Sequence, residues 1–306
     1  MVESYDAGSL PFDGDLGKYV KGAGSYEVGV FDESADFFEQ NVVRVFLDKL
    51  SAGLDIPNFP QFRDMNAMFF SMMDGLERIK EGYVETGRLM LKHSRGCLAE
   101  VSAIKKNAGK ICEKFGRTFR LKVCVTGPYT LASFFPYKTS ETFARLGEVV
   151  AAIVESNIFA EKAGIVAVVS VDEPVFGLVD DALIDRGAAG RESLFRAWED
   201  VFRAAKSRGA VTCLHLHSTA DGLFWGVKGL DVVESHVDDS LYSLRQTREF
   251  LEREGKVLKA SVCVNDFDRL IRESIAKASG QRLSEYALNQ EVAEVWKKLK
   301  SGEVAG

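Results

Sequence analysis

The sequence predicts an α/β fold, specifically a single-domain (β/α)8 TIM barrel spanning residues 1–306, and three observations support this prediction. From the middle of the chain onward, short β-branched runs alternate with longer amphipathic segments. About eight strand candidates lie in one chain without a Pro-rich or Ser-rich linker. The GxGxxG turn that opens many doubly wound sheets is absent, so a barrel is favoured over an open sheet.

The second half of the chain shows the clearest alternation of strands and helices. Strands are expected at Leu121–Val125, Ile165–Val171, Ala210–Leu216, Gly229–Ser235 and Val257–Val264. Helices are expected at Thr142–Ala163, Glu192–Ser207, Leu241–Glu254 and Phe267–Ala278. Repeated strand-then-helix units imply parallel strands joined by right-handed crossovers.

The first half carries weaker patterns. Short strands are expected at Tyr5–Ser9, Leu54–Pro57 and Cys97–Val101, and helices at Phe37–Leu50, Asp64–Glu77 and Ser102–Lys114. Together with the second half, these segments complete the predicted barrel.

Charge and composition exclude several classes of partner. The chain has 39 basic and 45 acidic residues, a net charge of −6 and no basic stripe, so neither nucleic acid nor an anionic membrane is expected as a partner. No apolar run approaches the roughly 20 residues that span a bilayer, and the first residues do not resemble a secretory leader, so we expect a soluble cytoplasmic protein. The five cysteines are far apart and include no Cys-x-x-Cys pair, as expected in a reducing compartment.

Histidine is scarce, with 4 in 306 residues, and its placement is informative. Because side chains alternate along a strand, His215 and His217 share one face, while Leu214 and Leu216 face the opposite way, toward the helices. The next expected strand carries Val232, Glu234 and His236 on one face, with His236 at its end.

Catalytic groups of barrel enzymes lie at the carboxyl ends of strands, so His215, His217 and His236 are expected together at that rim. Three neutral imidazoles with an open fourth position form a catalytic zinc arrangement. The alternative is that these histidines are hydrogen-bonded wall residues. Glu234 and Asp238 are further candidates as supporting groups or substitute ligands, while His93 is expected on the surface.

Other strand ends carry weaker signals. Asp172 and Glu173, followed by Pro174, end one expected strand, and a carboxylate there can hold an amine or orient a histidine. The alternative is an ordinary acidic turn. Ser9 ends the first expected strand, and Gly127 and Tyr129 follow another, where turn chemistry is the competing interpretation.

These segments together resemble the C-terminal catalytic barrel of the cobalamin-independent methionine synthase family, particularly its short archaeal-type members. The segments are Gly8–Pro11, Thr126–Leu131, Val171–Pro174, His215–His217 and Val262–Asn265. They occur in the family's order between residue 8 and about residue 265. The wider superfamily also contains corrinoid-linked methyltransferases and uroporphyrinogen decarboxylase.

The resemblance implies zinc-dependent transfer of a methyl group to a small thiol, in the type case homocysteine, which becomes methionine. It implies methylcobalamin, carried by a corrinoid protein, or methyltetrahydropterin as the donor. His215 would act as a catalytic zinc ligand, and Asp172 would act in catalysis and bind the substrate amine. Ser9 would bind the substrate, and Glu173, Gly127 and Tyr129 would line the same site.

The chain also departs from the family pattern. His217 stands at the position of a ligand Cys, and His236 at that of a ligand Glu. The family's last ligand, a Cys, falls near Asn289–Ala293, where Val292 cannot bind metal. The implied ligand set is therefore His215, His217 and His236, which leaves one coordination position for substrate or water.

Two other functions remain open from the residues. The same three histidines could activate water in a metal-dependent hydrolase or lyase, which would act without any thiol. The chain could also be a non-catalytic paralogue that has lost its metal.

Overall fold

The computed structural model describes residues 3–92, 96–237, 239–262, 267–279 and 285–301. The chain divides into two compact units, Met1–Ala260 and Ser261–Gly306. The first unit holds the sheet and all three histidines of the predicted site. The second contains α10 (Phe267–Ser279) and α11 (Glu285–Ser301), which pack on each other.

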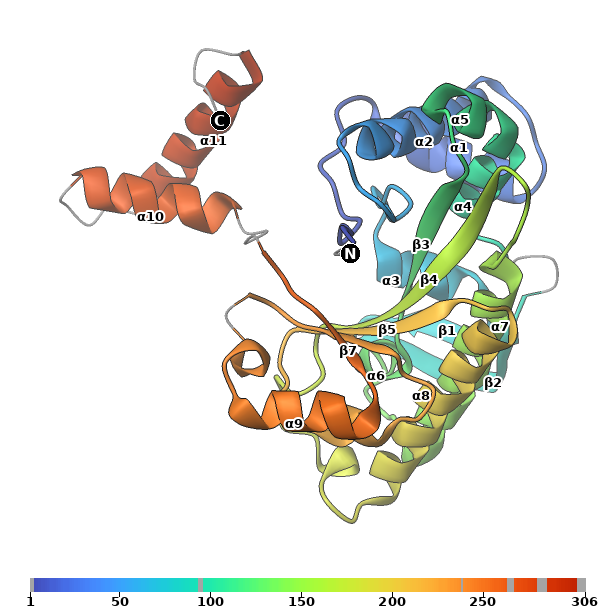
Figure 1. Cartoon of the computed structure of the whole chain (residues 1–306), viewed down its shortest axis with the longest axis vertical. Coiled ribbons are helices and arrows are strands. Elements are labelled where there is room, and N and C mark those ends of the chain that lie inside the picture. The colour runs from blue at the N-terminus through green and yellow to red at the C-terminus, as the bar shows by residue number, and fades with distance from the viewer. Residues whose placement is uncertain (1–2, 93–95, 238, 263–266, 280–284, 302–306) are drawn as a thin grey trace. The chain divides into compact units, whose positions relative to one another are not determined.

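A five-stranded parallel sheet forms the centre of the first unit (Figure 1). Its strands lie in chain order: β3 (Phe119–Thr126), β4 (Gly164–Glu173), β5 (Val211–Leu216), β6 (Val232–Glu234) and β7 (Val257–Lys259). An α/β fold with parallel strands is therefore confirmed.

Two preceding segments continue this order through isolated parallel bridges. Tyr5 pairs with Ile56, Ser9 with Gln61, and Asn58 with Lys122 of β3. Seven segments thus run parallel in sequence order, as in a barrel, while the described residues show no eighth strand that closes it.

Helices follow the strands, as the alternation predicts. The helices of the first unit are α1 (Leu16–Glu27), α2 (Glu33–Ser51), α3 (Met65–Ser71), α4 (Ala99–Lys106), α5 (Ala108–Phe115), α6 (Pro128–Ala132), α7 (Ser140–Asn157), α8 (Ala189–Ser207) and α9 (Arg245–Glu254), with short 3-10 turns at Ala182–Ile184, Leu223–Gly226 and Ser240–Tyr242. A Thr139 and Thr142 capping box begins α7. Gly147 of α7 lets α8 approach closely, since a Cβ there would lie 2.6 Å from that of Ala197.

Several expected elements differ from the structure. The expected strand at Cys97–Val101 is wrong, because α4 begins at Ala99 and the preceding Leu98 N–H donates to the Asn157 side chain. The expected helix Thr142–Ala163 ends at Asn157, where Ile158 becomes extended. The expected strand from Val257 is described as a strand only to Lys259, and residues 263–264 lie outside the described residues.

The largest difference is a β-hairpin in place of the end of the expected helix Asp64–Glu77. The helix stops at Ser71, and β1 (Met73–Ile79) then pairs antiparallel with β2 (Gly82–Leu91). Gly75, at a φ of +82°, sits at the irregularity in their pairing, where a Cβ would come within 2.2 Å of the Arg88 carbonyl oxygen. The helical spacing of apolar residues therefore misled the prediction at a glycine-dependent bulge.

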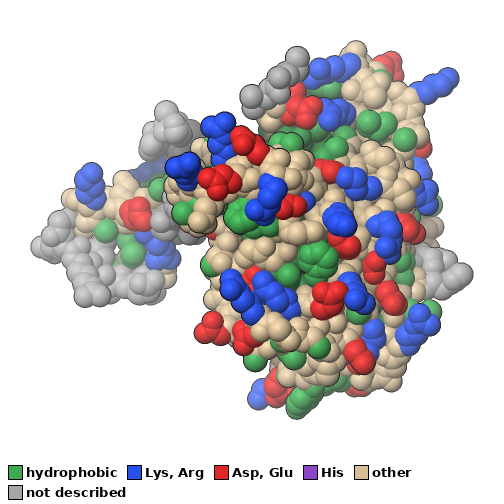
Figure 2. Space-filling view, turned by 60° about the horizontal axis from the view of Figure 1, so that its bottom comes forward, with side chains coloured by type: hydrophobic (Ala, Val, Ile, Leu, Met, Phe, Trp, Pro, Cys, Tyr) green, Lys and Arg blue, Asp and Glu red, His purple; other side chains and the backbone are tan. Residues whose placement is uncertain are grey.

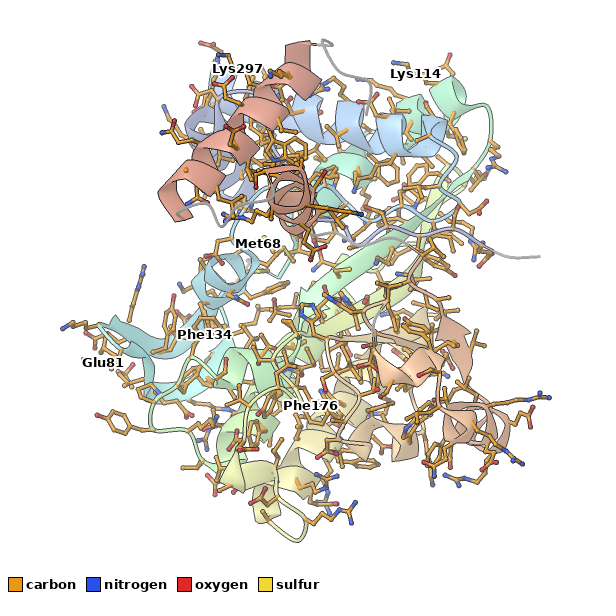
Figure 3. All side chains as sticks on the ribbon, turned by 90° about the vertical axis from the view of Figure 1, so that its left-hand side faces the viewer. Met68, Glu81, Lys114, Phe134, Phe176 and Lys297 are labelled. Atoms are coloured by element: carbon orange, nitrogen blue, oxygen red, sulfur yellow. The ribbon has the colours of Figure 1, made fainter. Side chains whose placement is uncertain are left out.

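The hairpin contacts the loop after α6 and the helix α3. Figure 3 shows Glu81 at its outer end, with Phe134 beside its base. The Tyr83 N–H donates to the Phe134 carbonyl at 2.9 Å, and the Tyr83 ring stacks on Phe70 with centroids 4.0 Å apart. The aromatic packing covers one side of the hairpin with apolar surface.

The two faces of the central strands differ in chemistry. Leu214 and Leu216 are fully buried in the large core shared with the helices, as the strand period predicts. Cys213 lies on the other face, in a smaller apolar cluster with Ile56, Ala167 and Val168. Several polar side chains of these strands lie on this inner face, above the cluster.

Charges of both signs are interspersed over the face drawn in Figure 2, without a continuous basic patch. None of the helices in the described segments combines the length and apolarity needed to cross a bilayer.

Glu173 joins three elements from the helix-facing side of β4. Its side-chain oxygens accept hydrogen bonds from the backbone of Tyr129 at 2.9 Å and Thr130 at 2.6 Å, and from Trp198 Nε1 of α8 at 2.8 Å. Gly127 leaves room for this carboxyl, because a Cβ there would lie 2.2 Å from Glu173 Oε1. Glu173 therefore fixes the start of α6 against α8.

We predict that Glu173→Gln changes the pH dependence of stability. Burial raises the pKa of Glu173 from 4.5 to about 7, despite its hydrogen bonds. A carboxyl with a raised folded-state pKa stabilises fully below pH 4.5, and this contribution is lost as pH rises to about 7. In urea denaturation, the unfolding free energy of the wild type relative to the variant should fall by about 3 kcal/mol across that window. A flat or rising difference would contradict this assignment.

Candidate metal centre

Three histidines meet at the carboxyl ends of two neighbouring strands. One ring nitrogen from each of His215, His217 and His236 can be chosen so that all three lie within 4.8 Å of one another. The ring centroids of His217 and His236 are 3.9 Å apart, and that of His215 lies 5.4 Å from His217 and 6.1 Å from His236. The structure therefore brings together the three residues that the strand pattern selects.

The sheet register explains this convergence. His215 lies near the end of β5 and pairs with Glu234 of β6, while His217 and His236 lie just past the ends of the two strands. His215 and His217 are partly buried and His236 is exposed. One side of the cluster is thus open to an incoming ligand.

Asp172 supports His215 from the adjacent strand. The two residues pair in the β4–β5 register, and Asp172 Oδ1 lies 3.6 Å from His215 Nδ1, slightly beyond a direct hydrogen bond. The same oxygen accepts a hydrogen bond from Ser170 Oγ at 2.9 Å. A carboxylate facing Nδ1 leaves Nε2 available as the ligand atom, as is common for metal-binding histidines.

The electrostatics distinguish the members of the cluster. Burial, together with the nearby His236 and His215, lowers the pKa of His217 to about 4. Burial also lowers the pKa of His215, but the Asp172 carboxylate outweighs it and leaves that pKa above the ordinary value. An unprotonated imidazole is the metal-binding form, and His217 is held in that form near neutral pH.

The predicted role of Glu234 as a substitute ligand is not the arrangement observed. Glu234 is not a member of the three-histidine group. Its Oε1 lies 2.7 Å from Lys259 Nζ of β7, and its Oε2 accepts a weak hydrogen bond from Cys213 Sγ at 3.8 Å. Burial raises the pKa of Glu234, but Lys122, His215 and Lys259 hold it below the ordinary value, so the carboxylate is ionised.

Lys122 and Lys259 were not expected from the sequence on the inner face of the sheet. Lys122 is 2% exposed on the inner face of β3, and the Lys259 side chain is 13% exposed. A lysine within an apolar strand was the available signal, because a buried ammonium requires anionic neighbours.

The predicted substrate contacts divide into two groups. Ser9 is exposed, and its hydroxyl lies 3.4 Å from Gln61 Oε1. Glu173 and Tyr129 are 0% and 3% exposed, so they present no surface to a substrate, and Gly127 packs against the Glu173 carboxyl. The contacts of these three residues in the structure are with other parts of the protein, and their expected part in substrate binding stays a prediction.

His93, Asp238 and Cys263 lie outside the described residues. The other four cysteines, Cys97, Cys112, Cys124 and Cys213, are free thiols. Val292 lies in α11 of the second unit and is 5% exposed.

Comparison with known proteins shows likeness at the level of fold. No profile of a known protein family matches the chain, and no curated protein matches its sequence. A solved B12-independent methionine synthase from a Shewanella species, in complex with selenomethionine, is similar with a TM-score of 0.53 and 14% identity, over 97% of this chain and 98% of that one. A protein from Listeria monocytogenes, described as a candidate vitamin-B12-independent methionine synthase, has a TM-score of 0.50 and 11% identity, over 97% and 99% of the two chains.

Proposed function

We propose that His215, His217 and His236 hold one zinc ion and that the protein transfers a methyl group to a thiol at that site. The convergence of the three imidazoles carries the proposal. The fold likeness to methionine synthase structures supports this choice of chemistry. We further propose that the parallel sheet belongs to a complete (β/α)8 barrel, whose strand ends are the usual place for such a site.

The donor set fits zinc. Zinc binds imidazole nitrogen at about 2.0–2.1 Å, and a tetrahedral arrangement then places the nitrogens about 3.3 Å apart. The present nitrogens lie within 4.8 Å of one another, so small side-chain rotations would close the remaining gap. Three ligands leave the fourth position for the substrate.

The proposed chemistry begins with the thiol. A thiol with a pKa of about 8.5 is mostly protonated at neutral pH, and a bound zinc ion supplies the charge that favours its thiolate. The thiolate lone pair would form the new S–CH₃ bond, the donor would keep the electron pair of the broken bond, and the thiol proton would pass to solvent. Asp172 would hold the His215 ring in orientation throughout.

The ligand set also bears on the methyl donor. Three neutral imidazoles leave the full charge of the dication on the site, which favours thiolate binding but draws electron density from sulfur. A weaker nucleophile needs a more activated donor. We therefore propose methylcobalamin, carried by a corrinoid protein, ahead of methyltetrahydropterin, with homocysteine as the first thiol to test.

The first prediction from the proposed function concerns metal content. Protein purified without chelator should contain close to one zinc per chain by elemental analysis, and His215→Ala or His236→Ala should abolish it, because each removes one of three ligands. His93→Ala is the matched control and should keep its zinc. Wild-type protein without metal under zinc-replete conditions would refute the proposed function.

The second prediction concerns the thiol. Adding homocysteine or 2-mercaptoethanol to cobalt-substituted protein should produce an intense sulfur-to-metal charge-transfer absorption, because sulfur would occupy the open position directly. Stoichiometric cobalt without this band would instead favour the water-activating hydrolase or lyase. In that case, catalysis should proceed without any thiol.

The third prediction concerns the donor. With metal-replete protein and homocysteine, methyl transfer from methylcobalamin should be faster than from methyltetrahydrofolate, since the sulfur is a weakened nucleophile. Product methionine measured over time gives both rates. Equal rates would show that the electron-poor ligand set does not select the donor.

A further inference from the structure

Glu234 is a carboxylate that the sheet register places beside the proposed metal site. It pairs directly with His215 across β5 and β6, and it precedes His236 by two residues on the same face of its strand. Carboxylate oxygen is a common zinc ligand. Three imidazoles plus this carboxylate would complete a closed, four-coordinate site with no position left for substrate.

In the structure, this carboxylate forms an ion pair with Lys259. Glu234 Oε1 lies 2.7 Å from Lys259 Nζ, and the two side chains are only 8% and 13% exposed. Lys259 pairs with Glu234 in the β6–β7 register, so the sheet itself sets the two side by side. The Lys259 ammonium also lies 5.2 Å from the centroid of the Tyr5 ring, which places it over an aromatic face.

A buried pair of this kind is difficult to open. Each member has given up most of its hydration, and separation would cost Lys259 its carboxylate partner and Glu234 its directly bonded ammonium. Removing only the Lys259 ammonium would leave the buried Glu234 carboxylate without a hydrogen-bonded cation, between Lys122 and any cation that the three imidazoles bind. Such a carboxylate gains most by joining that cation.

We propose that Lys259 is a positioning residue that holds Glu234 out of the metal coordination shell and so keeps the fourth position open for the thiol. This inference rests on the proposed function, because it assumes a metal at the three histidines. According to this proposal, the open coordination position depends on the ion pair of Glu234 and Lys259 as well as on the three histidines. Lys259 would act only through Glu234, which its ammonium contacts.

The test uses cobalt-substituted full-length protein with 2-mercaptoethanol as the probe thiol. In Lys259→Met, Glu234 should become a ligand, so the cobalt absorption changes before thiol is added and the thiol charge-transfer band is lost. Cobalt affinity should rise about tenfold, the lower end of the range by which supporting groups change metal affinity. The double variant Lys259→Met with Glu234→Gln should recover both the wild-type spectrum and the thiol band.

Two further variants keep the test decisive. Glu234→Gln alone should leave the cobalt spectrum and the thiol band as in the wild type, because Glu234 is not a ligand there. Lys259→Arg should also resemble the wild type, since it retains the ion pair. If circular dichroism shows that Lys259→Met does not fold, Lys259→Gln gives the same comparison with a smaller loss of hydrogen bonding.

The outcomes separate this inference from the proposed function. A wild-type protein that binds no cobalt refutes both. Normal cobalt and thiol binding in the wild type, with an unchanged spectrum and thiol band in folded Lys259→Met, overturns only the role of Lys259. A changed cobalt spectrum in Glu234→Gln alone would also overturn it, because Glu234 would then already be a ligand.

Discussion

The register of the parallel strands is the constraint on which the rest of the structure depends. Hydrogen-bonded pairing places Thr126, Asp172, His215, Glu234 and Lys259 in one row across β3 to β7. Because alternate side chains face opposite sides, a shift of one residue in a single strand would turn its members of this row toward the helices. The apolar partners on the helix side, such as Leu214 and Leu216, make that shift costly, since both are fully buried there. The packing of the helices thus fixes the order of charges on the inner face.

Charges of both signs lie close together on the inner face of the sheet, which explains how so many ionisable groups can be buried together. Lys122, Asp172, Glu234 and Lys259 comprise two cations and two anions on neighbouring strands, so their charges balance beneath the imidazoles. Each has at least one neighbour of opposite sign that offsets the cost of its burial. Cys213 belongs to the same layer, and its burial raises the thiol pKa to about 12, so it is a packing group and not a nucleophile. The proposed chemistry at this end of the sheet therefore depends on the histidines and not on this thiol.

Much of this arrangement could be predicted from the sequence, because it follows from local periodicity. The alternation along Val211–His217 was enough to place two histidines on the inner face, and the next strand delivered His236 beside them. Local patterns failed where one residue made the difference. Gly75 permits a bulged hairpin in a segment whose apolar residues have helical spacing. The ion pair of Glu234 and Lys259 was equally out of reach, since it depends on the pairing of two short strands 25 residues apart.

Glu173 shows why neighbouring carboxylates need separate arguments. Asp172 and Glu173 are adjacent in a motif that resembles a substrate-binding pair, yet the strand period sends them to opposite faces. Asp172 lies beside His215, whereas Glu173 accepts hydrogen bonds from the start of α6 and from Trp198. The motif therefore combines a carboxylate that lies beside His215 with one that anchors a helix. A side chain that packs beside a site is as constrained as one that faces it. The motif alone therefore cannot separate the two roles. The direction of each side chain separates them, and the strand period sets that direction.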